Sequence, residues 1–309
     1  MKKFVLALVA TALLIGAAVT YTINARQGVA EETPAEHLTL APGQLLFRDT
    51  GTGRVTALSA GVRRTSGLKC DRFAVARQTA VCLAARPGVL PPVTDMLVLD
   101  ENLNVRHQEA LPGTPSRARV SPDGKRVFWT LFVTGDSYAA MGFSTRAGLY
   151  DVESGQLVKT IEELPVFVDG ERYFASDVNY WGITFAPDGN RFYATLGSHG
   201  KTYLVEGNYA RYRGKTVREN VECPSLSPDG TRIAFKKKVS DGVWRLSVLD
   251  LATLRETELA ETRSVDDQAL WQDGSTVLYG LGPDVWAVPA DGTGSPRLVA
   301  AGAASPALT

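Results

Sequence analysis

The chain has 309 residues, of which 44% are hydrophobic and 21% are charged, the usage of a folded protein and not of a disordered one. Lysine and arginine number 33, as do aspartate and glutamate, so the formal net charge is zero and the totals give no sign of a nucleic-acid-binding surface. The three histidines, His37, His107 and His199, are far apart in sequence, which argues against a histidine-based metal site or catalytic triad.

The first 26 residues carry the clearest local signal. Residues 4–23 contain no charged side chain, and a helix of twenty residues spans roughly 30 Å, the thickness of a bilayer's hydrocarbon core. Two lysines precede this segment and one arginine follows it, which favours a cytoplasmic N-terminus and an extracytoplasmic body. We expect a single-pass anchor in the cell membrane. A cleaved signal peptide, which would yield a secreted protein, is the alternative.

Residues 27–39 are mostly polar or small and are expected to form a linker. From residue 40 onward, short β-branched and aromatic runs alternate with glycine, proline, aspartate and asparagine, which is typical of an all-β fold. One turn sequence recurs within this part: Ser-Pro-Asp-Gly, then arginine two residues later, then apolar and aromatic residues. Clear copies begin at Ser121, Ala186 and Ser227, and a weaker copy begins at Trp271.

The residue types of this turn explain its recurrence. Proline sets φ at the start of a tight turn, aspartate accepts hydrogen bonds from the backbone beyond it, and glycine tolerates positive φ. The aspartates of successive copies are 65, 41 and 44 residues apart, and periods near 40–45 predict four-stranded propeller blades. Residues 40–309 accommodate six blades, which closure of the two termini would turn into a ring without an open edge. We expect blades at 62–109, 110–165, 166–218, 219–261 and 262–300, and a sixth that combines 40–61 with 304–308.

The recurring Ser-Pro-Asp-Gly-x-Arg pattern resembles the repeat of TolB-type propellers, a family of periplasmic translocation proteins and their exported relatives. The resemblance covers most of residues 62–300. It implies an all-β, six-bladed β-propeller, here preceded by a single N-terminal transmembrane or signal helix. It also implies a protein-binding or scaffold role at the cell envelope, although propellers host unrelated activities.

Two of the three cysteines lie in the repeat whose turn sequence has degenerated. Aligning Val81 with Val127 of the next repeat places Cys70 and Cys82 on opposite strands of one hairpin, near each other. In an oxidising compartment they are expected to form a disulfide, and two buried free thiols are the alternative. The remaining Cys223 is expected to be a buried, unreactive side chain.

The residues just before each inner strand are expected to rim one mouth of the central channel, where propellers bind ligands. Two adjacent aspartates beside a glutamate there could form an oxygen site for Ca²⁺, and a solvated rim held by structural hydrogen bonds is the simpler alternative. Counting back from each turn gives the candidates Arg117, Asn179, Tyr180, Trp181, Glu222, Asp266 and Asp267.

No motif predicts catalysis or a cofactor. Ser198 precedes His199, but adjacency in sequence does not create a triad, and no Gly-x-Ser-x-Gly elbow or phosphate-binding glycine loop occurs. Of two basic runs, 236–238 is expected to be a solvated edge and 211–215 a possible partner contact.

The sequence therefore predicts a non-enzymatic, monomeric, extracytoplasmic propeller that binds a protein or peptide and no nucleic acid. The membrane is reached through the N-terminal helix. The alternative function is a metal-dependent propeller hydrolase or lactonase that uses an ion in the channel.

Overall fold

The described part of the chain is all β. The computed structural model describes residues 34–133 and 144–309, which contain strands and turns and no α-helix. The predicted anchor or signal helix at residues 1–26 and most of the linker at 27–39 lie outside the described residues. Within the described ranges, no helix is long and apolar enough to cross a membrane.

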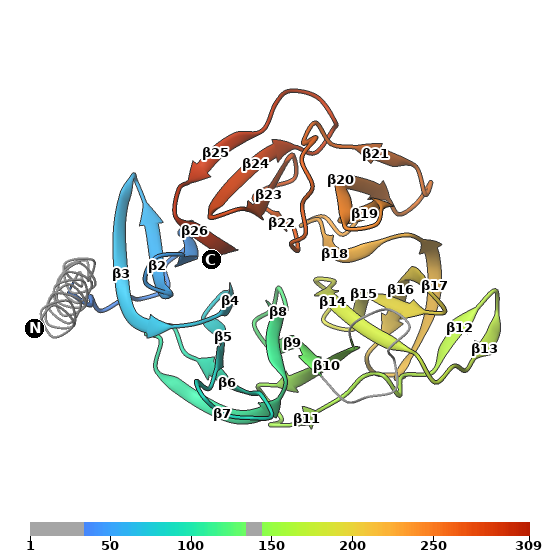
Figure 1. Ribbon diagram of the computed structural model, residues 1–309, viewed down its shortest axis with the longest axis horizontal. Helices are drawn as coiled ribbons and strands as arrows, with labels where there is room; N and C mark the ends of the chain where they lie inside the picture. The colour runs from blue at the N-terminus through green and yellow to red at the C-terminus, as the bar shows by residue number, and fades with distance from the viewer. Residues whose placement is uncertain (1–33, 134–143) are drawn as a thin grey trace, which may run out of the picture. The chain divides into compact units, whose positions relative to one another are not determined.

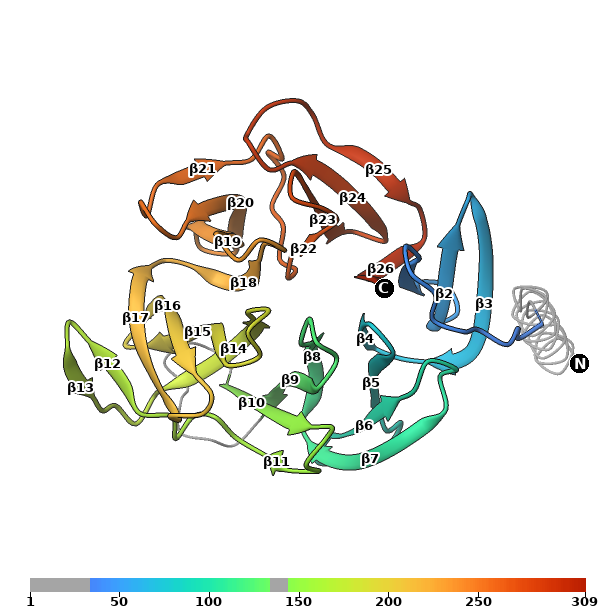
Figure 2. The same ribbon diagram turned by 180° about the vertical axis from the view of Figure 1, so that it is seen from behind.

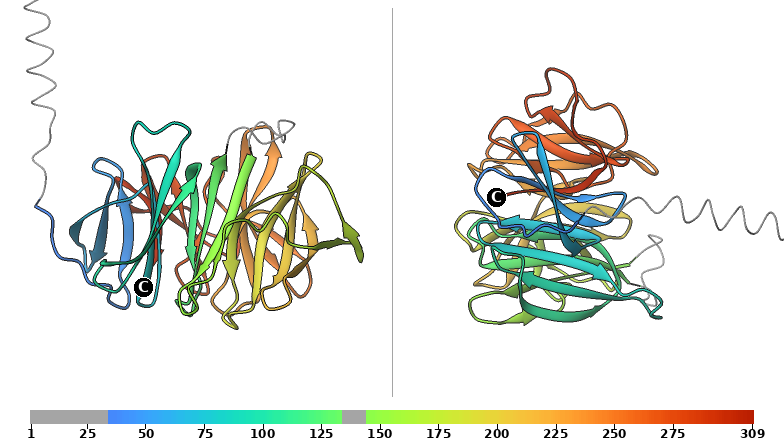
Figure 3. Two further views of the ribbon diagram at one scale, coloured as in Figure 1. Left: turned by 90° about the horizontal axis from the view of Figure 1, so that it is seen from below. Right: turned by 90° about the vertical axis from the view of Figure 1, so that its left-hand side faces the viewer.

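Six β-sheets are arranged around a central axis as the blades of a propeller (Figures 1 and 2). Seen from the side, their strands run along that axis (Figure 3). From the axis outward, blade 1 contains β26 (Ala303–Leu308), β1 (Leu45–Asp49), β2 (Arg54–Ser59) and β3 (Val62–Lys69). Blade 2 contains β4 (Arg72–Ala76), β5 (Thr79–Ala85), β6 (Val93–Leu99) and β7 (Val105–Pro112). Blade 3 contains β8 (Thr114–Val120), β9 (Arg126–Val133), β10 (Ser144–Asp151) and β11 (Leu157–Val158).

Blade 4 carries an inserted hairpin on its outer edge, which lies within the 65-residue step between the first two clear turn copies. It contains β14 (Asn179–Phe185), β15 (Arg191–Ser198), β16 (Lys201–Asn208) and β17 (Arg213–Glu219), followed outward by β12 (Val166–Val168) and β13 (Glu171–Tyr173) of the insertion. Blade 5 contains β18 (Glu222–Leu226), β19 (Arg232–Ser240), β20 (Val243–Asp250) and β21 (Glu256–Glu258). Blade 6 contains β22 (Leu270–Trp271), β23 (Thr276–Leu281), β24 (Asp284–Pro289) and β25 (Arg297–Ala300).

The ring closes in blade 1, where the C-terminal strand is the innermost one. β26 pairs antiparallel with β1, with Leu45 opposite Leu308 and Leu46 opposite Ala307. The expected exchange of strands between the termini is therefore present, and it satisfies the inner edge of β1 that would otherwise be unpaired. The label C in Figure 1 lies beside this strand, near the centre of the ring.

The expected blade boundary at residue 62 is wrong. β3 is the outermost strand of blade 1, and the inner strand of blade 2 starts only at Arg72. Two causes combine here: blade 1 needs a fourth strand on its outer side, and no Pro-Asp-Gly sequence marks the first turn of blade 2.

The recurring turn is held by its own side chains, as expected. In blade 5 the Ser227 hydroxyl donates to Asp229, and the backbone N–H of Arg232 donates to that hydroxyl at 3.0 Å. Gly230 has a φ of +73°, a conformation that a side chain would strain. Ser121, Asp123 and Arg126 repeat the same bonds in blade 3.

The arginine of this turn connects neighbouring blades. Arg126 of blade 3 donates to the carbonyl oxygen of Gly189 in blade 4 at 2.8 Å, and Arg232 of blade 5 donates to that of Gly274 in blade 6 at 2.6 Å. One residue type, at one place in the repeat, thus joins consecutive blades at the same mouth of the channel.

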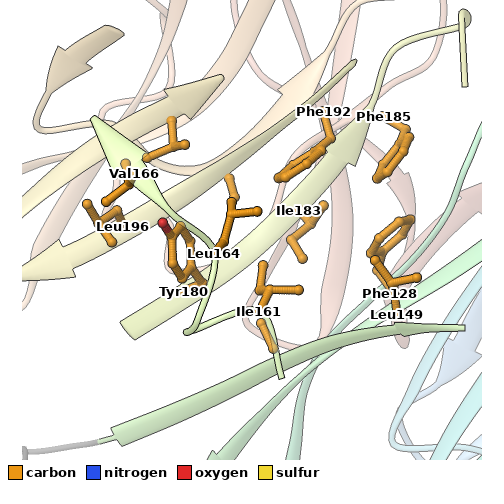
Figure 4. Close-up of a cluster of buried hydrophobic side chains, with 13 residues drawn as sticks. Phe128, Leu149, Ile161, Leu164, Val166, Tyr180, Ile183, Phe185, Phe192 and Leu196 are labelled. Carbon is orange, nitrogen blue, oxygen red and sulfur yellow. The ribbon is translucent and has the colours of Figure 1, made fainter. Parts of the chain in front are cut away.

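The apolar core lies mainly between the blades. Figure 4 shows the cluster between blades 3 and 4, in which Phe128 stacks on Phe185 with ring centroids 4.5 Å apart. Phe185 in turn stacks on Phe192 at 5.4 Å. Successive side chains of a strand face opposite sides, so each blade presents an apolar face to both neighbours.

Cys70 and Cys82 form a disulfide, as predicted, with their Cα atoms 5.5 Å apart. Cys70 directly follows β3, two residues before β4 begins, and Cys82 lies on β5 opposite Phe73. Leu38 and Leu40 are buried in the same cluster, so the chain just before residue 41 also packs against the propeller.

Reduction of this disulfide should lower the free energy of unfolding by about 3 kcal/mol, since it closes a loop with a sequence separation of 12. Urea unfolding with and without reductant measures the difference. The Cys70→Ala/Cys82→Ala variant is the control, because reductant should leave its midpoint unchanged. Equal midpoints of the oxidised and reduced wild-type protein would contradict a stabilising role.

Candidate functional site

Two cavities occupy the central channel, one at each mouth. The larger has a volume of about 1300 Å³ and is bordered by the β15–β16 and β19–β20 turns. The smaller has a volume of about 440 Å³ and is bordered by Pro122, Pro187 and Pro228 of the recurring turns. These two sets of turns lie at opposite ends of the strands that they connect. Arg72 and Arg117 line both cavities and so lie at their boundary.

The channel brings most of the predicted mouth residues together. Arg117, Trp181, Glu222 and Asp266 line the larger cavity, and Asp267 lines the smaller one. They come from blades 3, 4 and 5 and from the segment between β21 and β22, which turns toward the centre of the ring (Figure 1).

Two of the predicted residues line neither cavity. Tyr180 is completely buried between blades 3 and 4, as Figure 4 shows. Asn179 is also buried, and its amide oxygen accepts hydrogen bonds from the Thr145 N–H at 2.9 Å and from the Ser144 hydroxyl at 3.2 Å. Successive side chains of β14 point to opposite faces of the sheet, so Tyr180 lies in the core while Trp181 lines the cavity. Asn179 is covered by the residues of β10 to which it is hydrogen-bonded.

Lys236 is the centre of the charged cluster in the larger cavity. Its ammonium group contacts Asp266, lies 3.6 Å from a Glu222 oxygen, and lies 4.4 Å from the centre of the Trp244 ring. The indole N–H of Trp244 donates to a Glu222 carboxylate oxygen at 3.1 Å. Burial acts to lower the pKa of Lys236, but the neighbouring Cys223, Asp266 and Glu222 outweigh it and raise the pKa. The lysine therefore stays charged while its side chain is only 5% exposed.

The expectation of a solvated edge at 236–238 is thus wrong for Lys236. On β19 its side chain faces the channel, whereas Lys237 and Lys238 are 38% and 46% exposed. The sequence contains only the run of lysines; the two carboxylates that stabilise the buried charge come from residues 222 and 266.

Arginines from blades 2 and 3 reach across the channel to the segment before β22. Arg117 donates to the carbonyl oxygen of Asp266 at 3.1 Å, and Arg119 donates to that of Ala269 at 2.8 Å. Arg72 lies 3.8 Å from an Asp267 oxygen. The prediction did not include Arg72 or Arg119, although Arg119 lies two residues from Arg117 and so faces the same side of β8.

The oxygen site for Ca²⁺ that the sequence left open as one alternative is not assembled among the described residues. Lys236 lies between Glu222 and Asp266, while Asp267 faces Arg72 and Arg117. Across residues 34–133 and 144–309, no three or more histidine, cysteine, aspartate or glutamate side chains are grouped to hold a metal ion. Each carboxylate already faces a cation, which is not the arrangement that calcium sites use.

Ser198 and His199 belong to a hydrogen-bonded group outside the channel. The Tyr173 hydroxyl lies 2.8 Å from the Ser198 oxygen and 3.1 Å from His199 Nδ1, and Ser198 donates to Asp177 at 2.6 Å. The tyrosine stands between the serine and the histidine, whereas a nucleophilic serine needs the base itself as its partner. The group ties the inserted hairpin to the β15–β16 turn.

The basic run at 211–215 lies along a third, separate groove of about 800 Å³ beside the inserted hairpin. Lys215 on β17 lies 3.7 Å from Glu206, its cross-strand neighbour on β16. The free cysteine, Cys223, is buried at the larger cavity and carries a φ of +48° in the bulge of β18.

Comparison with solved structures supports the expected fold. The structure is similar to TolB from Acinetobacter baumannii, with a TM-score of 0.60 and 16% identity over 86% of this chain and 66% of that chain. It is also similar to a puromycin-hydrolyzing peptidase from Mycobacterium tuberculosis, with a TM-score of 0.54 and 17% identity over 87% of this chain and 45% of that one. Hydrazine synthase from Kuenenia stuttgartiensis matches with a TM-score of 0.52 and 15% identity over 85% of this chain and 79% of that chain.

No protein-family model matches the sequence, and no curated protein matches it. The chain spans just under two thirds of the TolB chain and less than half of the peptidase. At these identities the similarity establishes the TolB-like propeller fold alone, and the proteins that match it carry names of different activities.

Proposed function

We propose that the protein is a non-enzymatic, extracytoplasmic propeller that binds a protein or peptide at the larger mouth of its channel. The observation that carries this proposal is the cavity of about 1300 Å³, which exceeds the range of about 300–1000 Å³ typical of small-molecule sites. A segment of a protein fills such a volume better than a metabolite does.

The lining of this cavity suits protein recognition. Trp181, Trp244 and Arg117 are of the residue types that contribute most to binding energy in protein interfaces. Lys238 and Glu219, which are 46% and 58% exposed, add charges of both signs at the rim, and such charges select a complementary partner and orient it on approach.

Two features support localisation of the propeller outside the cytoplasm. The disulfide between Cys70 and Cys82 is of the kind that persists in oxidising compartments. The apolar segment predicted at residues 4–23 would carry the body of the protein across the membrane and hold it there, at the cell envelope. TolB, which has the same fold, is similar over 86% of this chain.

Photo-crosslinking in the cells that make the protein tests the site. A crosslinking residue at Val239, which is 51% exposed and lines the larger cavity, should capture one defined protein partner. The same residue at Thr231, at the opposite end of the same blade and exposed, is the matched control and should capture much less. Equal capture at both positions, or none at Val239, would contradict binding at this mouth.

The alternative, a hydrolase with a channel ion, makes a different prediction for melting. Because each channel carboxylate faces a cation, we expect Ca²⁺ and a chelator to leave the melting temperature unchanged. Differential scanning fluorimetry measures this. A rise of several degrees with Ca²⁺ that the Asp267→Ala variant abolishes would instead support the metal-dependent enzyme.

A further inference from the structure

The smaller cavity has an excess of positive charge. Its charged lining consists of three guanidinium groups, Arg72, Arg117 and Arg119, and one carboxylate, Asp267. In the larger cavity, by contrast, cations and carboxylates alternate, and Lys236 there faces both Glu222 and Asp266. Arg72 and Arg117 each have a carboxylate within 4.0 Å, whereas Arg119 has no ion pair among the described residues.

The arginines of the smaller cavity are incompletely hydrogen-bonded. The Nε atoms of Arg117 and Arg119 are buried and have no hydrogen-bond partner among the described residues. Arg117 donates to the carbonyl oxygens of Ser116 and Asp266, and its carboxylate neighbours are Asp266 at 3.5 Å and Asp267 at 4.0 Å. Arg72 lies 3.8 Å from Asp267, beyond the range of a good hydrogen bond. Within residues 34–133 and 144–309, the one acceptor of Arg119 is a neutral carbonyl oxygen, that of Ala269.

Such an arrangement of buried guanidinium groups is costly. A buried donor without an acceptor, and a buried charge without an opposite charge, both destabilise a fold. Burial lowers the pKa of Arg119 to about 10, although Asp267 and Cys223 oppose the shift, and this leaves the group charged at neutral pH. A group kept charged at this cost is well suited to receive an anion.

We propose that the smaller cavity binds a small organic carboxylate between Arg117 and Arg119. A planar guanidinium presents a fork of N–H donors that matches the two oxygens of a carboxylate. Much of the remaining wall is apolar and includes Phe73, Leu226 and Trp271, so the site takes an acid with an apolar body. This site opens at the opposite mouth from the proposed partner site. Arg117 lines both cavities, whereas Arg119 lines only the smaller one.

Isothermal titration calorimetry with defined probes tests this site. Phenylacetate represents a free acid, and N-acetylphenylalanine represents the C-terminus of a peptide; each is compared with its neutral amide. At least one acid should bind ten or more times more tightly than its amide, and the pair that does so identifies the source. Absence of binding by both acids, or equally tight binding of inorganic phosphate, would overturn the proposal.

Variants assign the binding to Arg119. Arg119→Gln should weaken binding of the acid at least tenfold while the melting temperature of the free protein stays the same or rises. Arg119→Lys keeps the charge without the fork, so it should fold even if the first variant does not and should also bind more weakly. The matched control is Arg63→Gln, because Arg63 also donates to a carbonyl oxygen but lies on the outer strand β3.

Two outcomes would overturn the assignment to Arg119. Unchanged affinity in both Arg119 variants would place the anion elsewhere. A large fall in the melting temperature of both variants, with none in the control, would make the guanidinium a structural group.

Discussion

Deleting residues 303–309 should abolish the cooperative unfolding transition of the propeller. The deletion removes β26, which supplies the innermost strand of blade 1 and pairs with β1. It also removes Ala303 and Ala307, which are buried in the cores shared with the neighbouring blades. Lost strand pairing and core burial together should cost about 5 kcal/mol or more, the whole stability of many domains.

Circular dichroism and urea unfolding measure this loss. A synthetic peptide of residues 297–309, added to the truncated protein, is the control, because it can pair with β1 and should restore the transition in a concentration-dependent way. A truncated protein that unfolds at the urea concentration of the wild type would show that closure by β26 is unimportant.

Replacing Lys236 by methionine should be the most damaging single substitution in the channel. The side chain is 5% exposed and its ammonium group faces both Glu222 and Asp266. Without it, the Glu222 carboxylate stays buried with the Trp244 N–H as its neighbour. Removing one partner of a buried ion pair costs about 3–5 kcal/mol, so we expect a loss of about 3 kcal/mol in the free energy of unfolding.

A double-mutant cycle separates the ion pair from packing. Glu222→Gln removes the carboxylate charge, so the Lys236→Met/Glu222→Gln variant should regain part of the stability lost in Lys236→Met. Urea unfolding of the four proteins gives the coupling energy. Strictly additive losses would contradict the interaction between the two residues, and a stable Lys236→Met variant would contradict its role in the channel.

The turns and the number of blades were predictable because their signals are local. Serine, aspartate and glycine act on residues within a few positions of one another, so the sequence around Ser121 or Ser227 contains the complete turn. The closing strand was predictable too, because pairing of the two termini removes the open edge of the ring. The start of blade 2 at Arg72 was not, because its turn lacks the recurring sequence.

The side-chain contacts that line the channel join residues far apart in sequence, so no local sequence pattern predicts them. Arg117 and Asp266, which are 149 residues apart, meet because blades 3 and 6 face each other across the ring. Counting back from the turns found both residues, but it could not show that Asp266 also contacts Lys236. Counting back also placed Tyr180 at the mouth of the channel, whereas its side chain is buried in the core between blades 3 and 4.

Hydrogen–deuterium exchange of the captured complex is the most direct test of the recognition role. In the presence of the partner, amides in the β15–β16 turn at 199–200 and in the β19–β20 turn at 241–242 should exchange more slowly, because these turns border the larger cavity. Amides in the recurring turns at 187–189 and 228–230 should be unaffected. Protection of the second pair of turns without the first would contradict partner binding at the larger mouth.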